Sequence, residues 1–135
     1  MRLTVVNTSV AALVLVVTAV SLSAQVLHDS PFYCDMSMLS AADRAHKDDI
    51  GRHLAAVRTG TRELSNGYEF QFPGDSDTLQ QLCDWIVTER LCCPFFDFDL
   101  RINRESGSMA LRLTGRAGTK AFIKADFGRW LETSR

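Results

Sequence analysis

Residues Thr88 to Asp99 read T-E-R-L-C-C-P-F-F-D-F-D, and a helical pattern changes to a strand pattern within this stretch. Pro94 has no amide hydrogen and disfavours helix in the residue before it, so Cys93 is predicted to be non-helical. The adjacent Cys92 and Cys93 are therefore expected at the C-terminal end of a helix, where the chain turns into a sheet. Two neighbouring sulfurs at such a corner can hold a soft metal ion, form disulfides or simply pack.

The segments on either side of this corner have clear periods. Upstream, a helix is predicted over 75–91, with a polar cap at its start and its apolar residues on one face. Cys83 lies within that apolar stripe and is expected to be a small buried hydrophobe. Downstream, apolar and polar residues alternate over 96–102 and again over 109–113, which predicts two strands joined by a hairpin turn at 104–107.

The earlier and later parts of the chain add three elements. A helix is predicted over 41–57, capped by Ser40. The polar stretch 59–66 reads as the end of that helix and a connection, and 68–72 alternates like a half-buried strand. A final helix is predicted over 119–131, capped by its first residue and with apolar residues at helical spacing.

The order helix, strand, helix, strand, strand, helix predicts an α+β domain. We expect a three-stranded antiparallel sheet with helices on one face, in which the third strand lies between the first two and is antiparallel to both. Without the first helix, the pattern is a ferredoxin-like split unit that lacks its last strand.

The N-terminus predicts export. Residues 1–24 have a single charge, Arg2, then an apolar centre and a small-residue cleavage site, as in a signal peptide. An uncleaved membrane anchor is the alternative. Residues 25–39 keep no period and are expected to be an irregular segment ahead of a single domain over 40–135. The mature protein is then expected in the periplasm or outside the cell, with no stable membrane insertion.

Charge excludes one class of partner. The chain has 15 Lys and Arg against 16 Asp and Glu, a net charge of −1, and its basic residues are scattered. Nothing in that pattern predicts a nucleic-acid surface, so the expected partner is a metal ion or another protein. The sequence does not indicate an oligomeric state.

Four cysteines in an exported domain allow disulfides, with three possible pairings. A bridge between Cys92 and Cys93 is disfavoured, because neighbouring residues on a trans peptide rarely meet disulfide geometry. If bridges form, Cys34 and Cys83 are each expected to take one of the pair.

The same cysteines predict a metal site, because thiolates favour copper(I), zinc and other thiophilic ions. The candidate ligands are Cys92 and Cys93, with Cys34 as a third sulfur and with His46 and Glu89 as further donors. The partial negative charge of a helix C-terminus disfavours thiolates, and Arg90 is expected to offset it. The identity of the ion is left open.

Three functions follow from these residues. The first is an exported domain that binds and sequesters a thiophilic metal or metalloid ion through its vicinal cysteines, without turning over a substrate. The second is a disulfide-stabilised module outside the cytoplasm whose partner is another protein. The third is a thiol-dependent enzyme or redox protein, although no Ser/His/Asp or Cys/His pattern and no Cys-x-x-Cys motif is present.

The stretch Glu89-Arg90-Leu91-Cys92-Cys93-Pro94-Phe95, followed by L-R-L-T-G and G-T-K, resembles an uncharacterised family of small bacterial proteins with the motif E-R-x-C-C-P-F. The resemblance extends from Cys34 through the final helix. It implies a shared domain and no particular reaction. Cys83 lies outside the family pattern, which again implies a structural role for it.

Overall fold

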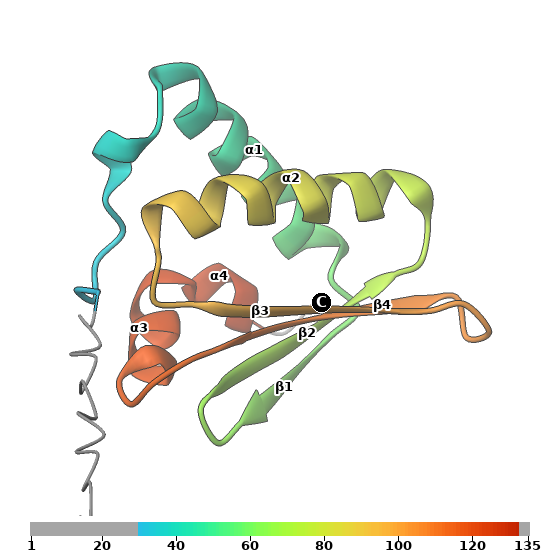
Figure 1. Cartoon of the computed structure of the whole chain (residues 1–135). Helices are drawn as coiled ribbons and strands as arrows, with labels where there is room; N and C mark the ends of the chain where they lie inside the picture. The colour runs from blue at the N-terminus through green and yellow to red at the C-terminus, as the bar shows by residue number, and fades with distance from the viewer. Residues whose placement is uncertain (1–29, 133–135) are drawn as a thin grey trace, which may run out of the picture.

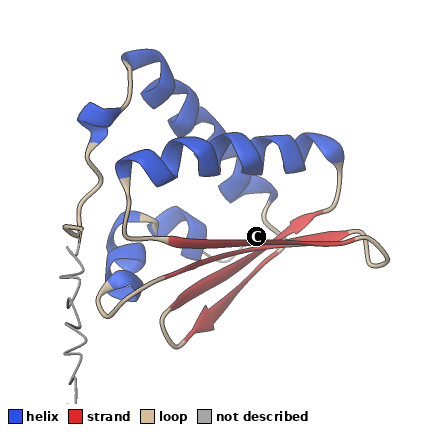
Figure 2. Cartoon of the chain, viewed as in Figure 1, coloured by secondary structure: helices blue, strands red, loops and turns tan. Residues whose placement is uncertain are grey.

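The computed structural model describes residues 30–132, and its four strands form one antiparallel sheet in the order β1-β2-β4-β3 (Figure 2). The α+β class is confirmed. The elements, in chain order, are η1 (Met36–Met38), α1 (Ala41–Val57), β1 (Gly60–Leu64), β2 (Gly67–Pro73), α2 (Ser76–Cys92), β3 (Asp97–Asn103), β4 (Ser108–Thr114), α3 (Thr119–Asp126) and α4 (Gly128–Leu131).

The sheet has one strand more than predicted. Strand β4 lies between β2 and β3 and is antiparallel to both, as expected. The prediction of three strands is wrong because the polar segment Gly60–Leu64 pairs with β2 as an edge strand, from Gly60 opposite Gln71 to Leu64 opposite Gly67. An edge strand of this kind is held by backbone hydrogen bonds and buries none of its own side chains fully, so it has no apolar alternation to reveal it.

The helices cover one face of the sheet, and the core lies between the two layers (Figure 1). The register places Phe70 opposite Leu111 and Phe72 opposite Met109, so these four side chains point to the same face, where all are almost wholly buried. The Trp130 ring of α4 meets the Phe70 ring edge-on, with 5.1 Å between centroids. Burial of this apolar face is the main force that holds the helices to the sheet.

The opposite face of the sheet carries a row of charges across its four strands. Glu69 in β2 receives hydrogen bonds from Arg62 in β1, at 2.8 and 3.1 Å, and from Arg112 in β4, at 2.7 Å. Arg112 also lies 3.6 Å from Asp99 in β3. Opposite charges in directly paired positions stabilise neighbouring strands, and here they leave this face polar.

The final helix differs from its prediction. It is divided at Phe127 into α3 and α4, and the residue that precedes it is Gly118, whose φ of 103° lies in the left-handed region that favours glycine. Thr119 is therefore not the cap: it is the first helical residue and is fully buried. Among residues 30–132, no helix is both long and apolar enough to cross a membrane.

Candidate metal centre

The corner predicted at Pro94 is present, and it determines where the cysteines lie. Helix α2 ends at Cys92, and Cys93 follows as a non-helical cap with φ −121° and ψ 72°. The Cys93 amide still donates to the carbonyl oxygen of Glu89, at 2.8 Å. Glu89 and Cys92 are three residues apart on the same face of α2, and the side chain of neither is exposed.

The segment before α1 brings the third sulfur to this corner. The Asp35 amide donates to the carbonyl oxygen of Cys92 at 2.7 Å, which satisfies one of the free carbonyls at the end of α2. Arg44 of α1 donates to the carbonyl oxygens of Met36 and Leu39, at 3.0 and 2.7 Å, and so ties the same segment to α1. These contacts place Cys34 beside Cys93, with 4.5 Å between their Cα atoms, and the two form a disulfide.

We call Cys34, Glu89, Cys92 and Cys93 the Cys–Glu group. One ligand atom from each of the four lies within 4.8 Å of all the others. The Sγ atoms of Cys92 and Cys93 are 3.8 Å apart, and the Sγ of Cys34 lies 3.9 Å from Oε1 of Glu89. A disulfide sulfur carries no hydrogen. The approach of Cys34 Sγ to Glu89 Oε1 is therefore a contact without a hydrogen bond, and between Cys92 and Cys93 only the Cys92 thiol can donate.

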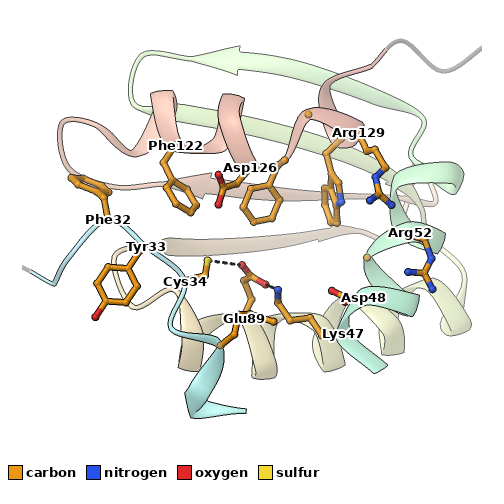
Figure 3. Close-up of a pocket in the computed structure, with 15 residues that line it drawn as sticks. Phe32, Tyr33, Cys34, Lys47, Asp48, Arg52, Glu89, Phe122, Asp126 and Arg129 are labelled. Atoms are coloured by element: carbon orange, nitrogen blue, oxygen red, sulfur yellow. Dashed lines mark hydrogen bonds and ion pairs between the residues drawn. The ribbon is translucent and has the colours of Figure 1, made fainter. Parts of the chain in front are cut away.

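The Glu89 carboxylate is paired with Lys47 of α1, whose Nζ lies 3.0 Å from Oε2 (Figure 3). The Glu89 side chain has no exposure, and that of Lys47 is 13% exposed. Burial raises the pKa of Glu89, and the Lys47 charge opposes this rise. Burial alone would lower the pKa of Lys47, but the charge and hydrogen bond of Glu89 outweigh it and the pKa is raised. Lys47 therefore stays protonated beside the group.

Cys92 is a buried free thiol. Burial raises its pKa, and the charge of Glu89 raises it further. The thiol thus keeps its proton at neutral pH, and a metal ion that binds there has to displace it.

Four of the five predicted ligands come together, and the fifth does not. Cys34, Glu89, Cys92 and Cys93 form the Cys–Glu group, whereas His46 is exposed on α1 and lies outside it. His46 is therefore not among the ligands that the fold brings together.

Two further expectations about cysteine and charge need correction. Cys34 pairs with Cys93 as one of the two bridges considered, but Cys83 is free and exposed, so it is neither bridged nor a buried hydrophobe. Arg90 is exposed, and the cation at the site is Lys47. Lys47 is three and seven residues before the buried Ile50 and Leu54, and this spacing on α1 is the signal that could have found it.

A groove of about 940 Å³ opens beside the Cys–Glu group. It lies between α1 and α2 on one side and α3 and α4 on the other, and Cys34 and Glu89 form part of its lining (Figure 3). Most of the remaining lining residues are aromatic or charged.

Comparisons of the chain with protein-family models, with curated proteins and with solved structures found no match. The resemblance to proteins with the E-R-x-C-C-P-F motif therefore stays a prediction. Function is inferred from the chemistry of the Cys–Glu group.

Proposed function

We propose that the Cys–Glu group binds a thiophilic metal or metalloid ion after reduction of the Cys34–Cys93 disulfide. The observation that carries this proposal is the convergence of three sulfurs and one carboxylate oxygen within 4.8 Å. With metal–sulfur distances of about 2.3 Å, two sulfurs on a tetrahedral ion lie about 3.8 Å apart. The Cys92 and Cys93 sulfurs already have a separation of 3.8 Å.

Reduction frees the Cys34 and Cys93 sulfurs to act as ligands beside Cys92. The Cys34 and Cys93 sulfurs have to separate from a bond of about 2.0 Å to about 3.8 Å, an increase that rotation of their side chains can supply. Glu89 Oε1, 3.9 Å from Cys34 Sγ, then completes a set of three soft donors and one hard donor. The nearby Lys47 ammonium offsets part of the negative charge that three thiolates and a carboxylate bring together.

In this function the domain sequesters an ion and turns over no substrate. We further propose that the chain is exported, as residues 1–24 predict, although these lie outside the described residues. An oxidising compartment favours the disulfide, and reduction then determines when the site can take up an ion.

The second candidate is a disulfide-stabilised module with a protein partner. The bridge between Cys34 and Cys93 favours it, because it ties the segment before α1 to the end of α2 across 59 positions. In this case the sulfurs are structural, and reduction weakens the fold without creating a site.

Metal titration of the reduced protein separates the two candidates. The protein is reduced with a phosphine, and the phosphine is then removed under anaerobic conditions. The reduced protein is titrated with Cd²⁺, and binding is followed by the thiolate-to-metal charge-transfer absorbance. We expect the reduced protein and the Cys83→Ser control to bind one ion per chain, and the oxidised protein to bind none. Cys92→Ser is expected to weaken binding about ten-fold or more. Absence of binding to the reduced protein, or equal losses in Cys83→Ser and Cys92→Ser, would exclude the metal site.

A further inference from the structure

The groove beside the Cys–Glu group is much larger than a metal ion requires. Its volume of about 940 Å³ lies within the range of pockets that hold small organic molecules, roughly 300–1,000 Å³. The groove is therefore large enough to accommodate a small organic ligand.

Access to the disulfide is one-sided. Cys34 lines the groove and is partly exposed, whereas Cys93 is fully buried and is absent from the lining. A reagent in the groove thus reaches the disulfide at the Sγ of Cys34, and the Cys93 sulfur is left as the leaving group.

The rest of the groove carries charges of both signs. Arg52 of α1 and Arg129 of α4 lie at the end away from Cys34, while Asp48 and Asp126 lie between (Figure 3). Arg52 pairs with Asp49, but both side chains are more than half exposed, and such a surface pair is weak enough to exchange for a ligand. The fifteen lining residues also include an apolar wall of three aromatic side chains, from Phe122, Phe127 and Trp130.

We propose that the groove binds a low-molecular-weight zwitterionic thiol, which opens the Cys34–Cys93 disulfide. The thiol sulfur lies at the Cys34 end, a carboxylate of the ligand faces Arg52 and Arg129, and its ammonium group faces the aspartates. The inference rests on the proposed function in one respect: opening of the disulfide by the thiol produces the reduced state in which the Cys–Glu group takes up an ion.

The chemistry is a two-step thiol–disulfide exchange. The ligand thiolate attacks Cys34 Sγ, a mixed disulfide forms on Cys34, and the bond to Cys93 breaks with Cys93 leaving as a thiolate. The Cys92 thiol, which in the oxidised protein donates to the carbonyl oxygen of Glu89 at 3.5 Å, lies 3.8 Å from the Cys93 sulfur and can turn its hydrogen towards that thiolate. A second ligand thiolate then attacks the mixed disulfide at the ligand sulfur. Cys34 is released and takes up a proton, as does Cys93, and two ligand thiols become one ligand disulfide.

The test compares glutathione, a zwitterionic thiol, with the neutral 2-mercaptoethanol at equal thiolate concentrations and without metal. The rate of disulfide opening is expected to saturate with glutathione and to rise linearly with 2-mercaptoethanol. Arg129→Ala and Asp126→Ala are expected to raise the half-saturating glutathione concentration about five-fold or more, since each removes a charged contact. Arg104→Ala, in the exposed β3–β4 turn, is the matched control and is expected to leave it unchanged.

Mass spectrometry of the mixed disulfide gives an independent readout that does not depend on the variants. Glutathione is expected on Cys34. A linear rate with glutathione, or an adduct predominantly on Cys93, would overturn the inference. Because the Cd²⁺ titration uses phosphine-reduced protein, its outcome does not depend on the groove, and failure of one proposal is distinguishable from failure of the other.

Discussion

The Nζ atom of Lys47 lies 3.0 Å from Oε2 of Glu89, a carboxylate with no exposure to solvent. This ion pair joins α1 to the end of α2 at the place where the sulfurs converge. It makes the stability of the domain and the charge of the site depend on the same two residues.

Replacing Lys47 by Met should lower the free energy of unfolding at pH 8 by about 3 kcal/mol, because a buried carboxylate is left without its partner. Burial raises the pKa of Glu89, and loss of Lys47 removes the charge that opposes this rise. Between 4.5 and the raised pKa, the folded variant binds more protons than the unfolded chain, so its stability rises as pH falls. Urea unfolding at pH 8 and pH 5 measures this. The exposed Lys124→Met is the control, and equal losses in Lys47→Met at both pH values would contradict the prediction.

The two free thiols should react at very different rates. Cys83 is exposed, whereas Cys92 is fully buried and burial raises its pKa. In the unreduced protein at pH 8, iodoacetamide is expected to modify Cys83 readily and Cys92 only after addition of denaturant, as followed by peptide mass spectrometry. Similar rates at the two positions in the folded protein would be incompatible with the buried position of Cys92.

Loss of the disulfide should weaken the whole domain. The bridge spans 59 positions, and in the chain-entropy model a loop of this length contributes about 4 kcal/mol to stability. Cys34→Ser is therefore expected to lower the free energy of unfolding by that amount in urea titrations without reductant. Cys83→Ser should change it by less than about 0.5 kcal/mol. A Cys34→Ser free energy of unfolding close to that of the unsubstituted protein would show that the bridge contributes little to stability.

The β1–β2 hairpin depends on Gly67. A Cβ added there would lie 2.0 Å from the carbonyl oxygen of Leu113 in β4, a backbone atom that cannot move without breaking the ladder. Gly67→Ala should destabilise the fold by about 3 kcal/mol. At Gly128, a Cβ meets nothing within 4 Å, and Gly128→Ala should stabilise α4 by roughly 0.5 kcal/mol. Thermal unfolding of Gly67→Ala and Gly128→Ala provides the comparison. Equal melting temperatures for the two variants would contradict the pairing of Gly67 with Thr114 in β4.

Acid stability should depend on Glu69. Hydrogen bonds from Arg62 and then Arg112 lower its pKa from 4.5 to about 2. A carboxylate whose folded pKa is lowered contributes stability that is present above 4.5 and is lost as pH falls towards 2. Glu69→Gln should lower stability at pH 7 and flatten its decline over this range, measured by urea unfolding as a function of pH. Glu105→Gln, in the exposed β3–β4 turn, is the control and should leave the dependence of stability on pH unchanged. If Glu69→Gln loses stability below pH 4.5 as steeply as the unsubstituted protein does, the charges around Glu69 do not determine acid stability.

Local sequence was sufficient for most of the fold. Pro94 ends α2 wherever the rest of the chain lies, since it lacks an amide hydrogen and constrains Cys93. Alternation determined β2, β3 and β4, and the position of β4 between β2 and β3 is the one that the ferredoxin-like split unit predicts. Strand β1 was missed because its stability comes from hydrogen bonds to β2, which leave no pattern in its own side chains.

The sequence by itself also determined that two sulfurs and a carboxylate lie at one helix end, because Glu89 and Cys92 belong to the last turn of α2 and Cys93 follows directly as its cap. Only the tertiary structure decided that Cys34 bonds to Cys93, that Lys47 pairs with Glu89, and that Cys83 and His46 face away. These positions depend on how α1 and the segment before it pack on α2. That packing is set by the burial of the whole core, a sum of many weak contacts that short-range periodicity does not encode.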